Sequence, residues 1–286
     1  MSAGPRAILV APAAAWLAIA WAWPILLVFA MSLREFDQVT MQLRGYTLEH
    51  YTQVLTDPFY LEAFLRSLRI AAITTLLSAI LGYPAALHIA TMRSQRGRAL
   101  FTLIVLIPVM LSLVVTAFAW ILILGPSGLV SRAAAFLRLS SGPLTLLNTE
   151  PGVVIVLVYS FCPYMIMSIR TALEKIDPHM LRAAAIHGAR PSLAFYRITL
   201  PLSVPGILSG GLMVFALSAA AFVTPYVIGG SRVKVVPLIV YNAAVTTFEW
   251  PLAATLSVLL LFVMLALTFA VGRFTERRFA AWLRGT

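Results

Sequence analysis

PLAATLSVLLLFVMLALTFAVG, residues 251–272, contains no Asp, Glu, Lys or Arg. A helix rises about 1.5 Å per residue, so a run of this length crosses a hydrocarbon core of about 30 Å. Because lipid cannot hydrogen-bond with exposed backbone groups, a spanning segment must be a helix or part of a closed barrel. The run is continuously apolar without alternation of period two, which excludes a barrel strand. Residues 251–272 therefore predict a transmembrane helix.

Five further intervals lack charged residues over comparable lengths. They predict helices at about 8–32, 68–91, 100–124, 151–170 and 204–228. The first interval is too long for the apolar region of a signal peptide, so we expect it to be retained as a span. The whole chain is 61% hydrophobic and 11% charged, whereas soluble domains carry about 25% charged residues. We predict an all-α polytopic membrane protein with about six transmembrane helices.

The distribution of charge predicts how the chain is oriented. With both termini in the cytoplasm, the cytoplasmic segments contain thirteen Lys and Arg residues and three acidic residues. The outer segments then contain eight and seven, respectively. Basic residues favour cytoplasmic loops, so we predict a multi-pass membrane protein with N-in, C-in topology. The net charge of +11 then needs no nucleic-acid partner to explain it.

The cytoplasmic segment between the fourth and fifth predicted helices has the most specific pattern. Residues 174–207 read EKIDPHMLRAAAIHGARPSLAFYRITLPLSVPGI. Asp177 can cap free N–H groups, and Pro178 is favoured at a first helical position. The pattern predicts a short helix that ends near His187, with Gly188 in a left-handed conformation.

A second short helix follows the turn in this segment. Ser192 can cap it, and we expect it to reach Ile198 before the chain returns to the membrane. In the first helix, Met180, Leu181 and Ala184 lie close to one face. That face could dock in a groove of another protein or lie on the lipid surface, and the residues alone leave both readings open.

The spacing in this segment resembles the EAA loop of type I ABC importer permeases. The matching positions are Ala183-Ala184, Gly188-Ala189, Phe195, Ile198, Leu200-Pro201 and Pro205-Gly206-Ile207. The resemblance implies a coupling helix that inserts into a cleft of an ATP-hydrolysing subunit. One position departs from the family pattern, because its usual glutamate falls on Arg182 and the charge of that contact is reversed.

The resemblance also assigns expected roles to individual residues. The expected ATPase interface comprises Asp177, Met180, Leu181, Arg182, Ala183, Ala184, His187, Gly188, Ala189 and Arg190. The expected framework of the loop comprises Phe195, Leu200, Pro201, Pro205 and Gly206. Gly206 and Gly210, four positions apart, also form a small-residue face that predicts a close helix–helix contact.

Other stretches are similar to the spermidine/putrescine-type branch of this family. They are Ser32-Leu33, the segment from Tyr46 to Tyr60, Gly82-Tyr83-Pro84, Phe222-Val223-Thr224-Pro225, Gly229-Gly230 and residues 249–254. This likeness implies a permease subunit of a bacterial inner membrane that takes up a polyamine-like solute. The branch also serves ferric iron, thiamine and phosphonates, which stay as alternatives. It further implies an N-terminal helix and outer loop over 1–62, a transmembrane core over 63–275 that includes the coupling loop 174–200, and a cytoplasmic tail over 276–286.

The energy source is expected to lie outside the chain. A phosphate-binding loop needs a Gly-Lys pair, but the two lysines, Lys175 and Lys234, follow Glu and Val. The chain is expected to be non-catalytic and to bind no cofactor or metal itself. The resemblance implies two ATPase subunits carrying ATP and Mg²⁺, a second permease that is expected to be a different chain, and a solute-binding protein. A polytopic enzyme or channel is the alternative, but it would need polar catalytic groups at one depth.

Candidates for lining or gating the path lie in the last three predicted helices and the loops between them. They are Tyr159, Tyr164, Phe222, Thr224, Tyr226, Asn242, Glu249 and Trp250. Aromatic faces and outer carboxylates would suit a polyamine through cation–π and charge contacts. Anchoring at the membrane interface is the alternative role for these aromatic residues.

Overall fold

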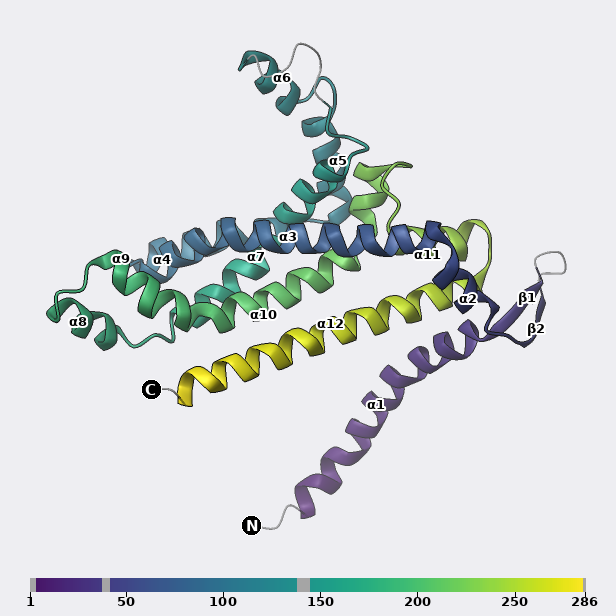
Figure 1. Ribbon diagram of the computed structural model, residues 1–286, viewed down its shortest axis with the longest axis horizontal. Coiled ribbons are helices and arrows are strands. Elements are labelled where there is room, and N and C mark those ends of the chain that lie inside the picture. The colour runs from purple at the N-terminus through teal and green to yellow at the C-terminus, as the bar shows by residue number, and fades with distance from the viewer. Residues whose placement is uncertain (1–3, 38–41, 138–144, 285–286) are drawn as a thin grey trace. The chain divides into compact units, whose positions relative to one another are not determined.

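The computed structural model describes residues 4–37, 42–137 and 145–284, and two compact units divide the chain between them. The first unit comprises Met1–Glu62 and Leu238–Leu265, and the second comprises Ala63–Pro237 and Ala266–Thr286. Three helices, all labelled in Figure 1, have residues in both units. They are α3 (Pro58–Thr91), α11 (Val236–Tyr241) and α12 (Trp250–Arg284).

The first unit joins helix ends around one buried serine. It contains α1 (Gly4–Ser32), the antiparallel strands β1 (Arg34–Asp37) and β2 (Gln42–Tyr46), α2 (Glu49–Thr56) and the π-helical turn η3 (Asn242–Thr246). The Ser32 hydroxyl forms a 2.6 Å hydrogen bond with the Tyr51 hydroxyl, and the Ser32 carbonyl accepts one from Thr255 at 3.1 Å. These bonds fasten the end of α1 to α2 and α12.

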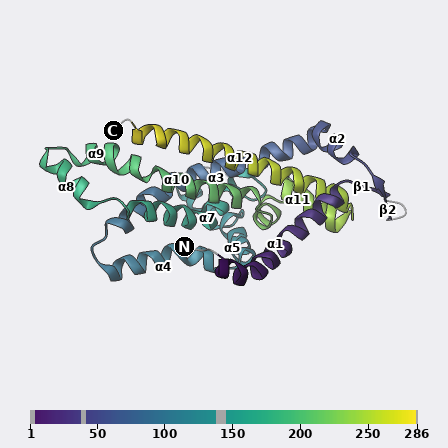
Figure 2. The same cartoon turned by 90° about the horizontal axis from the view of Figure 1, so that it is seen from below.

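The second unit is built around α7 (Glu150–Leu173). It also contains α4 (Gln95–Met110), α5 (Leu113–Leu124), α6 (Leu129–Phe136), α8 (Pro178–Ile186), α9 (Pro191–Ala194), η1 (Phe195–Thr199), α10 (Leu200–Ala219) and η2 (Pro225–Gly229). Helices α3, α7 and α10 run alongside one another in both ribbon views (Figures 1 and 2). Within the apolar part of α7, 61% of residues are buried, against 22–33% in the other long apolar helices, so α7 forms the centre of this core.

The predicted small-residue contact is confirmed between α7 and α10. A Cβ atom added to Gly206 would lie 2.5 Å from the Cβ of Ala172. One turn further along α10, a Cβ on Gly210 would lie 2.9 Å from the Cβ of Ser168. The Ser168 hydroxyl also donates to the Gly206 carbonyl at 3.0 Å. Glycine on α10 thus allows the two backbones to approach, as in other membrane helix pairs.

The predicted all-helical polytopic fold is confirmed. Within the described residues, five helices are long and apolar enough to cross a membrane: Pro58–Thr91, Leu113–Phe136, Glu150–Leu173, Pro191–Ala219 and Trp250–Arg273. The first predicted span, 8–32, lies within α1, which contains the apolar stretch Trp16–Ser32. The outer segment that follows α1 contains the hairpin of β1 and β2, which hydropathy did not predict.

The third predicted span, 100–124, was wrong as a single helix. α4 ends at Met110, and α5 begins at Leu113 after two residues in extended conformation. Figure 1 shows α5 leaving the direction of α4. Pro108 cannot donate a backbone hydrogen bond and therefore weakens the last turn of α4. The apolar stretch that can span the membrane runs instead over Leu113–Phe136.

The fifth predicted span, 204–228, was also misplaced. α10 ends at Ala219, and residues Pro225–Gly229 form the separate turn η2. At its other end the helix extends back through η1 to Pro191, so the span runs over Pro191–Ala219. Hydropathy did not detect the break because residues on both sides of it are apolar. The division of the chain at residues 62 and 275 stays a prediction.

Candidate functional site

The predicted short helix after α7 is present as α8. It begins after Asp177, whose carboxylate accepts a hydrogen bond from the His179 amide at 2.8 Å. It ends at Ile186, one residue before the predicted end, and Gly188 has a φ of +77°. This is the left-handed conformation that terminates helices and favours glycine. Both ends of the helix therefore follow from local sequence.

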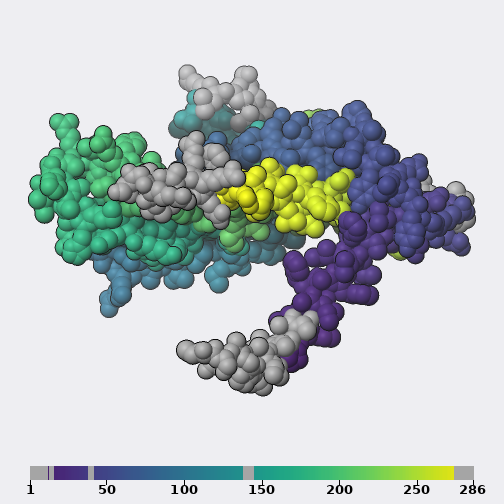
Figure 3. All heavy atoms as spheres, turned by 60° about the horizontal axis from the view of Figure 1, so that its bottom comes forward, coloured from purple at the N-terminus to yellow at the C-terminus, as the bar shows by residue number. Residues whose placement is uncertain are grey.

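Helix α8 lies at one end of the second unit and has no buried residue (Figures 1 and 3). Its large apolar side chains are exposed, with Met180 at 47%, Leu181 at 38% and Ile186 at 85%. Ala184 is the one residue of α8 that is partly covered. An exposed apolar helix of this kind is compatible both with docking in a groove of another protein and with lying on the lipid surface.

The surface of α8 is basic as well as apolar. The Arg182 side chain donates to the Pro178 carbonyl at 3.4 Å, within its own helix. In the part of the chain that the structure describes, Arg182 and Arg190 form no ion pair with a carboxylate. Asp177 is engaged in the cap of the helix. A partner that covers this surface would face uncompensated positive charge.

The second predicted helix of this segment differs in its start and its end. Ser192 is not its cap, because α9 already begins at Pro191, after Arg190 in extended conformation. The helix also does not stop at Ile198. It passes through the π-helical turn η1 into α10. Of the predicted framework residues, Phe195 lies in η1, and Leu200, Pro201, Pro205 and Gly206 lie in the first two turns of α10.

A hydrogen-bonded ring at the start of the segment was missed by the sequence analysis. The Glu174 carboxylate receives Arg170 Nε at 2.8 Å and lies 3.5 Å from Arg98 Nη1. Arg170 also donates to the Thr102 hydroxyl at 2.7 Å, and that hydroxyl donates to the Arg98 carbonyl at 2.7 Å. The i,i+4 spacing of Arg170 and Glu174 was a visible signal. The partners on α4 were not.

A second contact at the far end of the segment was also missed. The Tyr83 hydroxyl lies 3.0 Å from the Ser203 hydroxyl. The Tyr83 ring packs edge-on against Phe195, with 5.8 Å between ring centroids. Tyr83 belongs to the Gly82-Tyr83-Pro84 stretch, whose likeness to one family branch did not indicate a role.

Five of the predicted path residues belong to the second unit. The rings of Phe222 and Tyr226 stack with 5.5 Å between their centroids and an interplanar angle of 27°. Tyr159 packs edge-on against Trp120. Tyr164 lies beside Phe161, and Thr224 is buried. The other three, Asn242, Glu249 and Trp250, belong to the first unit.

The path candidates of the first unit surround the start of α12. The indole of Trp250 donates to the Ala244 carbonyl at 3.1 Å, and the Glu249 amide donates to the Ala243 carbonyl at 2.8 Å. Asn242 opens the π-helical turn η3 and is exposed. π-Helical turns are rare in proteins, and those that occur are often at functional sites. Asn242 lies in η3 and Tyr226 lies in η2, so both candidates are in such turns.

The start of α7 forms an ion cluster with α3. Glu150 pairs with Arg66 at 3.1 Å through Oε1 and with Arg69 through Oε2. Arg66 also donates to the Arg232 carbonyl at 3.2 Å. The Glu150 carboxylate therefore links two guanidinium groups of α3 to the start of α7 at the predicted outer side.

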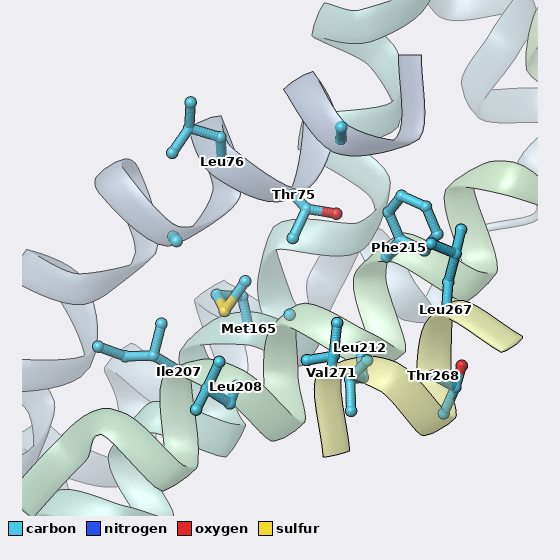
Figure 4. A pocket seen from close by; sticks show the side chains of 13 residues that line it. Thr75, Leu76, Met165, Ile207, Leu208, Leu212, Phe215, Leu267, Thr268 and Val271 are labelled. Carbon is cyan, nitrogen blue, oxygen red and sulfur yellow. The ribbon is translucent and has the colours of Figure 1, made fainter. Parts of the chain in front are cut away.

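A cavity of about 400 Å³ lies among α3, α7, α10 and α12 (Figure 4). Its lining is apolar apart from the hydroxyls of Thr75 and Thr268. The Thr75 hydroxyl donates to the Ala71 carbonyl. None of the predicted path residues lines this cavity. Within the described residues, no group of three or more His, Cys, Asp and Glu side chains is arranged to hold a metal ion.

Comparison with known proteins gives consistent matches over most of the chain. Residues 78–280 match the profile of a family described as binding-protein-dependent transport system inner membrane component. The spermidine/putrescine transport system permease protein PotB of Haemophilus influenzae is 30% identical over 258 residues, which cover 90% of each chain. The molybdenum transport system permease protein ModB of Mycobacterium bovis is 32% identical over 222 residues, 77% of this chain and 81% of that protein.

The fold also matches solved structures. A chain of a bacterial ABC transporter that imports the acidic polysaccharide alginate aligns with a TM-score of 0.76 over 95% of this chain and 96% of its own length. A chain of the MetNI methionine ABC transporter aligns with a TM-score of 0.59 over 76% of this chain and 94% of its own. Their sequence identities are 17% and 15%, so these matches concern the fold alone.

Proposed function

Because this chain belongs to the family of binding-protein-dependent transport system inner membrane components, we propose that α8 is the helix through which an ATPase subunit drives it. The chain is a multi-pass permease subunit of an ABC importer in a bacterial inner membrane. It is the non-catalytic membrane component, and ATP is handled by a separate ATPase partner. We propose which part of the chain the ATPase subunit contacts and which solute the importer transports.

The exposure of α8 carries the first part of the proposal. The helix is capped at Asp177 and terminated at Gly188 by local interactions, so it forms without burying any side chain. Its apolar residues Met180, Leu181 and Ile186 are available to a partner. A short amphipathic helix laid into a groove is a common mode of protein recognition. The remaining interface residues, Ala183, His187 and Ala189, lie on the same helix and its closing turn.

The positive charge of α8 indicates which side chains its partner should present. Arg182 and Arg190 would be desolvated in a groove, and an unpaired desolvated charge is costly. We therefore expect carboxylates on the ATPase groove opposite Arg182. In the family pattern this position of the permease is a glutamate, so the charge at the contact is reversed on the permease side and is expected to be reversed on the ATPase side.

Transport then follows from an alternation between two packings. Closure of two ATPase subunits on ATP would move α8, and the helices attached to it would switch the path between outward- and inward-facing states. A second permease, a different chain, would supply the other wall of the path. A solute-binding protein would deliver the solute to the outer loops.

The solute is proposed to be polyamine-like. PotB of Haemophilus influenzae is similar over 90% of both chains, and its name records spermidine and putrescine. The stacked pair Phe222 and Tyr226 and the carboxylate of Glu249 are groups that bind a linear cation well. They remain proposed path residues, together with Tyr159, Tyr164, Thr224, Asn242 and Trp250.

An anionic solute is the second candidate. ModB, a molybdenum permease, matches with 32% identity, and the guanidinium groups of Arg66 and Arg69 both lie beside Glu150. Guanidinium groups are well suited to bind an oxyanion. Ferric iron, thiamine and phosphonates are the other solutes of the branch that the sequence resembles.

Reconstitution of the complete importer in liposomes tests both parts of the proposal. The permease pair, the ATPase and the cognate binding protein are combined, and uptake of labelled spermidine is compared with uptake of labelled molybdate. ATP-driven spermidine uptake that is lost on Gly188→Pro substitution or on deletion of residues 180–190 supports the proposal. Wild-type uptake by either variant would refute the role of α8, and uptake of molybdate alone would refute the polyamine assignment.

A further inference from the structure

The segment that contains α8 is attached to the rest of the second unit at two points. We call the first the proximal joint (Arg98, Thr102, Arg170 and Glu174) and the second the distal joint (Tyr83, Phe195 and Ser203). Between them, none of residues 177–193 is buried. A force applied to α8 can therefore reach the helices through the chain and through these two joints.

The proximal joint connects the end of α7 to α4. Glu174 follows the last residue of α7, and its carboxylate contacts Arg170 at 2.8 Å and Arg98 at 3.5 Å. Arg98 also donates to the Met92 carbonyl at 2.9 Å, in the turn between α3 and α4. Thr102 closes the ring by bonding to Arg170 and to the Arg98 carbonyl. Hydrogen bonds between charged partners are stronger than neutral ones, so this joint resists separation of α7 from α4.

The distal joint connects the far side of the segment to α3. The hydroxyls of Tyr83 and Ser203 lie 3.0 Å apart, and Ser203, which is fully buried, also donates to the Leu200 carbonyl at 2.9 Å. The Tyr83 ring contacts Phe195 inside the π-helical turn η1. A π-helical turn breaks the regular hydrogen-bond pattern of a helix, so it is a point at which α9 can pivot relative to α10.

We propose that Glu174 and Tyr83 are positioning residues of the transport cycle, which transmit movement of α8 to α4 and to α3, respectively. The proposal rests on the role proposed for α8 and adds the route by which its movement reaches the spans. The partners of Glu174 are Arg170 and Arg98, and those of Tyr83 are Ser203 and Phe195. Their effect is on how much transport each hydrolysed ATP produces.

The experiment measures solute uptake and ATP hydrolysis in the same proteoliposomes, so that their ratio is obtained. Glu174→Gln removes the charge of the proximal joint and keeps its size, and Tyr83→Phe removes only the hydroxyl of the distal joint. We expect each to lower uptake per ATP by about fivefold, which corresponds to the loss of one hydrogen bond worth about 1 kcal/mol. Hydrolysis should continue at close to the wild-type rate.

Two matched variants serve as controls. Tyr196→Phe removes a hydroxyl next to the distal joint, because Tyr196 follows Phe195 in the chain. Tyr196 is 66% exposed. Glu35→Gln neutralises an exposed carboxylate in β1. Both should keep the wild-type ratio. Co-purification of each variant with the ATPase confirms assembly before uptake is measured.

The possible results separate the joints from the role of α8 itself. If Gly188→Pro abolishes uptake while Glu174→Gln and Tyr83→Phe keep the wild-type ratio of uptake to hydrolysis, the proposed role of the two joints is refuted. The role of α8 as the driven helix is then retained. A parallel fall of uptake and hydrolysis, at a constant ratio, would also refute the proposed role of the two joints. It would mean that the joints only support assembly of the complex. A lowered ratio in both variants, with both controls unchanged, supports the proposal.

Discussion

Gly206 of α10 packs directly against Ala172 of α7: a Cβ atom on Gly206 would lie 2.5 Å from the Cβ of Ala172. The Ser168 carbonyl would be 2.9 Å from the same atom. No L side chain can be accommodated at that distance without a shift of one helix. The spacing between α7 and α10 therefore depends on the absence of a side chain at Gly206, and one turn further at Gly210.

Gly206→Val should destabilise the protein by pushing α10 away from α7. Overpacking of this kind costs about 1–3 kcal/mol. The measurement is thermal unfolding of the purified permease in detergent. Gly272→Val is the control, because a Cβ at Gly272 would have no neighbour within 4 Å. Equal melting temperatures for the two variants would contradict the close packing.

Gly188 should tolerate Asn better than Val. Its φ of +77° is unfavourable for a β-branched residue by about 1–2 kcal/mol, whereas Asn adopts this region more readily. A Cβ at this position would have no neighbour within 4 Å, so backbone conformation alone decides the result. We expect Gly188→Asn to retain most ATP-driven uptake and Gly188→Val to lose more of it. The reverse order would show that the left-handed turn is not needed.

Arg182→Glu should weaken binding of the ATPase subunit. The substitution places a carboxylate opposite the carboxylates expected on the groove, and loss of a buried charge pair costs about 2 kcal/mol or more. Arg182→Lys keeps the charge and should retain more of the affinity. Titration of the reconstituted permease with the ATPase measures both. Tighter binding by Arg182→Glu would mean that the partner groove is basic.

Glu249→Gln should lower the uptake of a cationic solute and leave ATP hydrolysis unchanged. The carboxylate stands at the start of α12, and its neutralisation removes an attraction for cations entering from the predicted outer side. Uptake is measured over a range of spermidine concentrations, so that a change in apparent affinity is separated from a change in maximal rate. Unchanged uptake with unchanged hydrolysis would remove Glu249 from the path.

The sequence was most informative where structure is decided locally. The cap at Asp177, the termination at Gly188 and the contact at Gly206 depend on single residue types with strong conformational preferences, and all three were predicted. The sequence misplaced the ends of elements inside apolar stretches. Residues 111–112 break one predicted span, and α10 stops at Ala219, yet apolar residues continue on both sides of each break.

The amino-acid sequence by itself determined that the chain is a set of apolar helices with a capped helix between two of them. Hydropathy and capping act over a few residues, so they can be read along the chain. Only the tertiary structure decided which side chains meet, such as Tyr83 with Ser203, 120 residues apart, or Arg170 with Thr102, 68 residues apart. These contacts depend on how the helices pack and rotate against one another, and no local pattern of residues specifies that rotation.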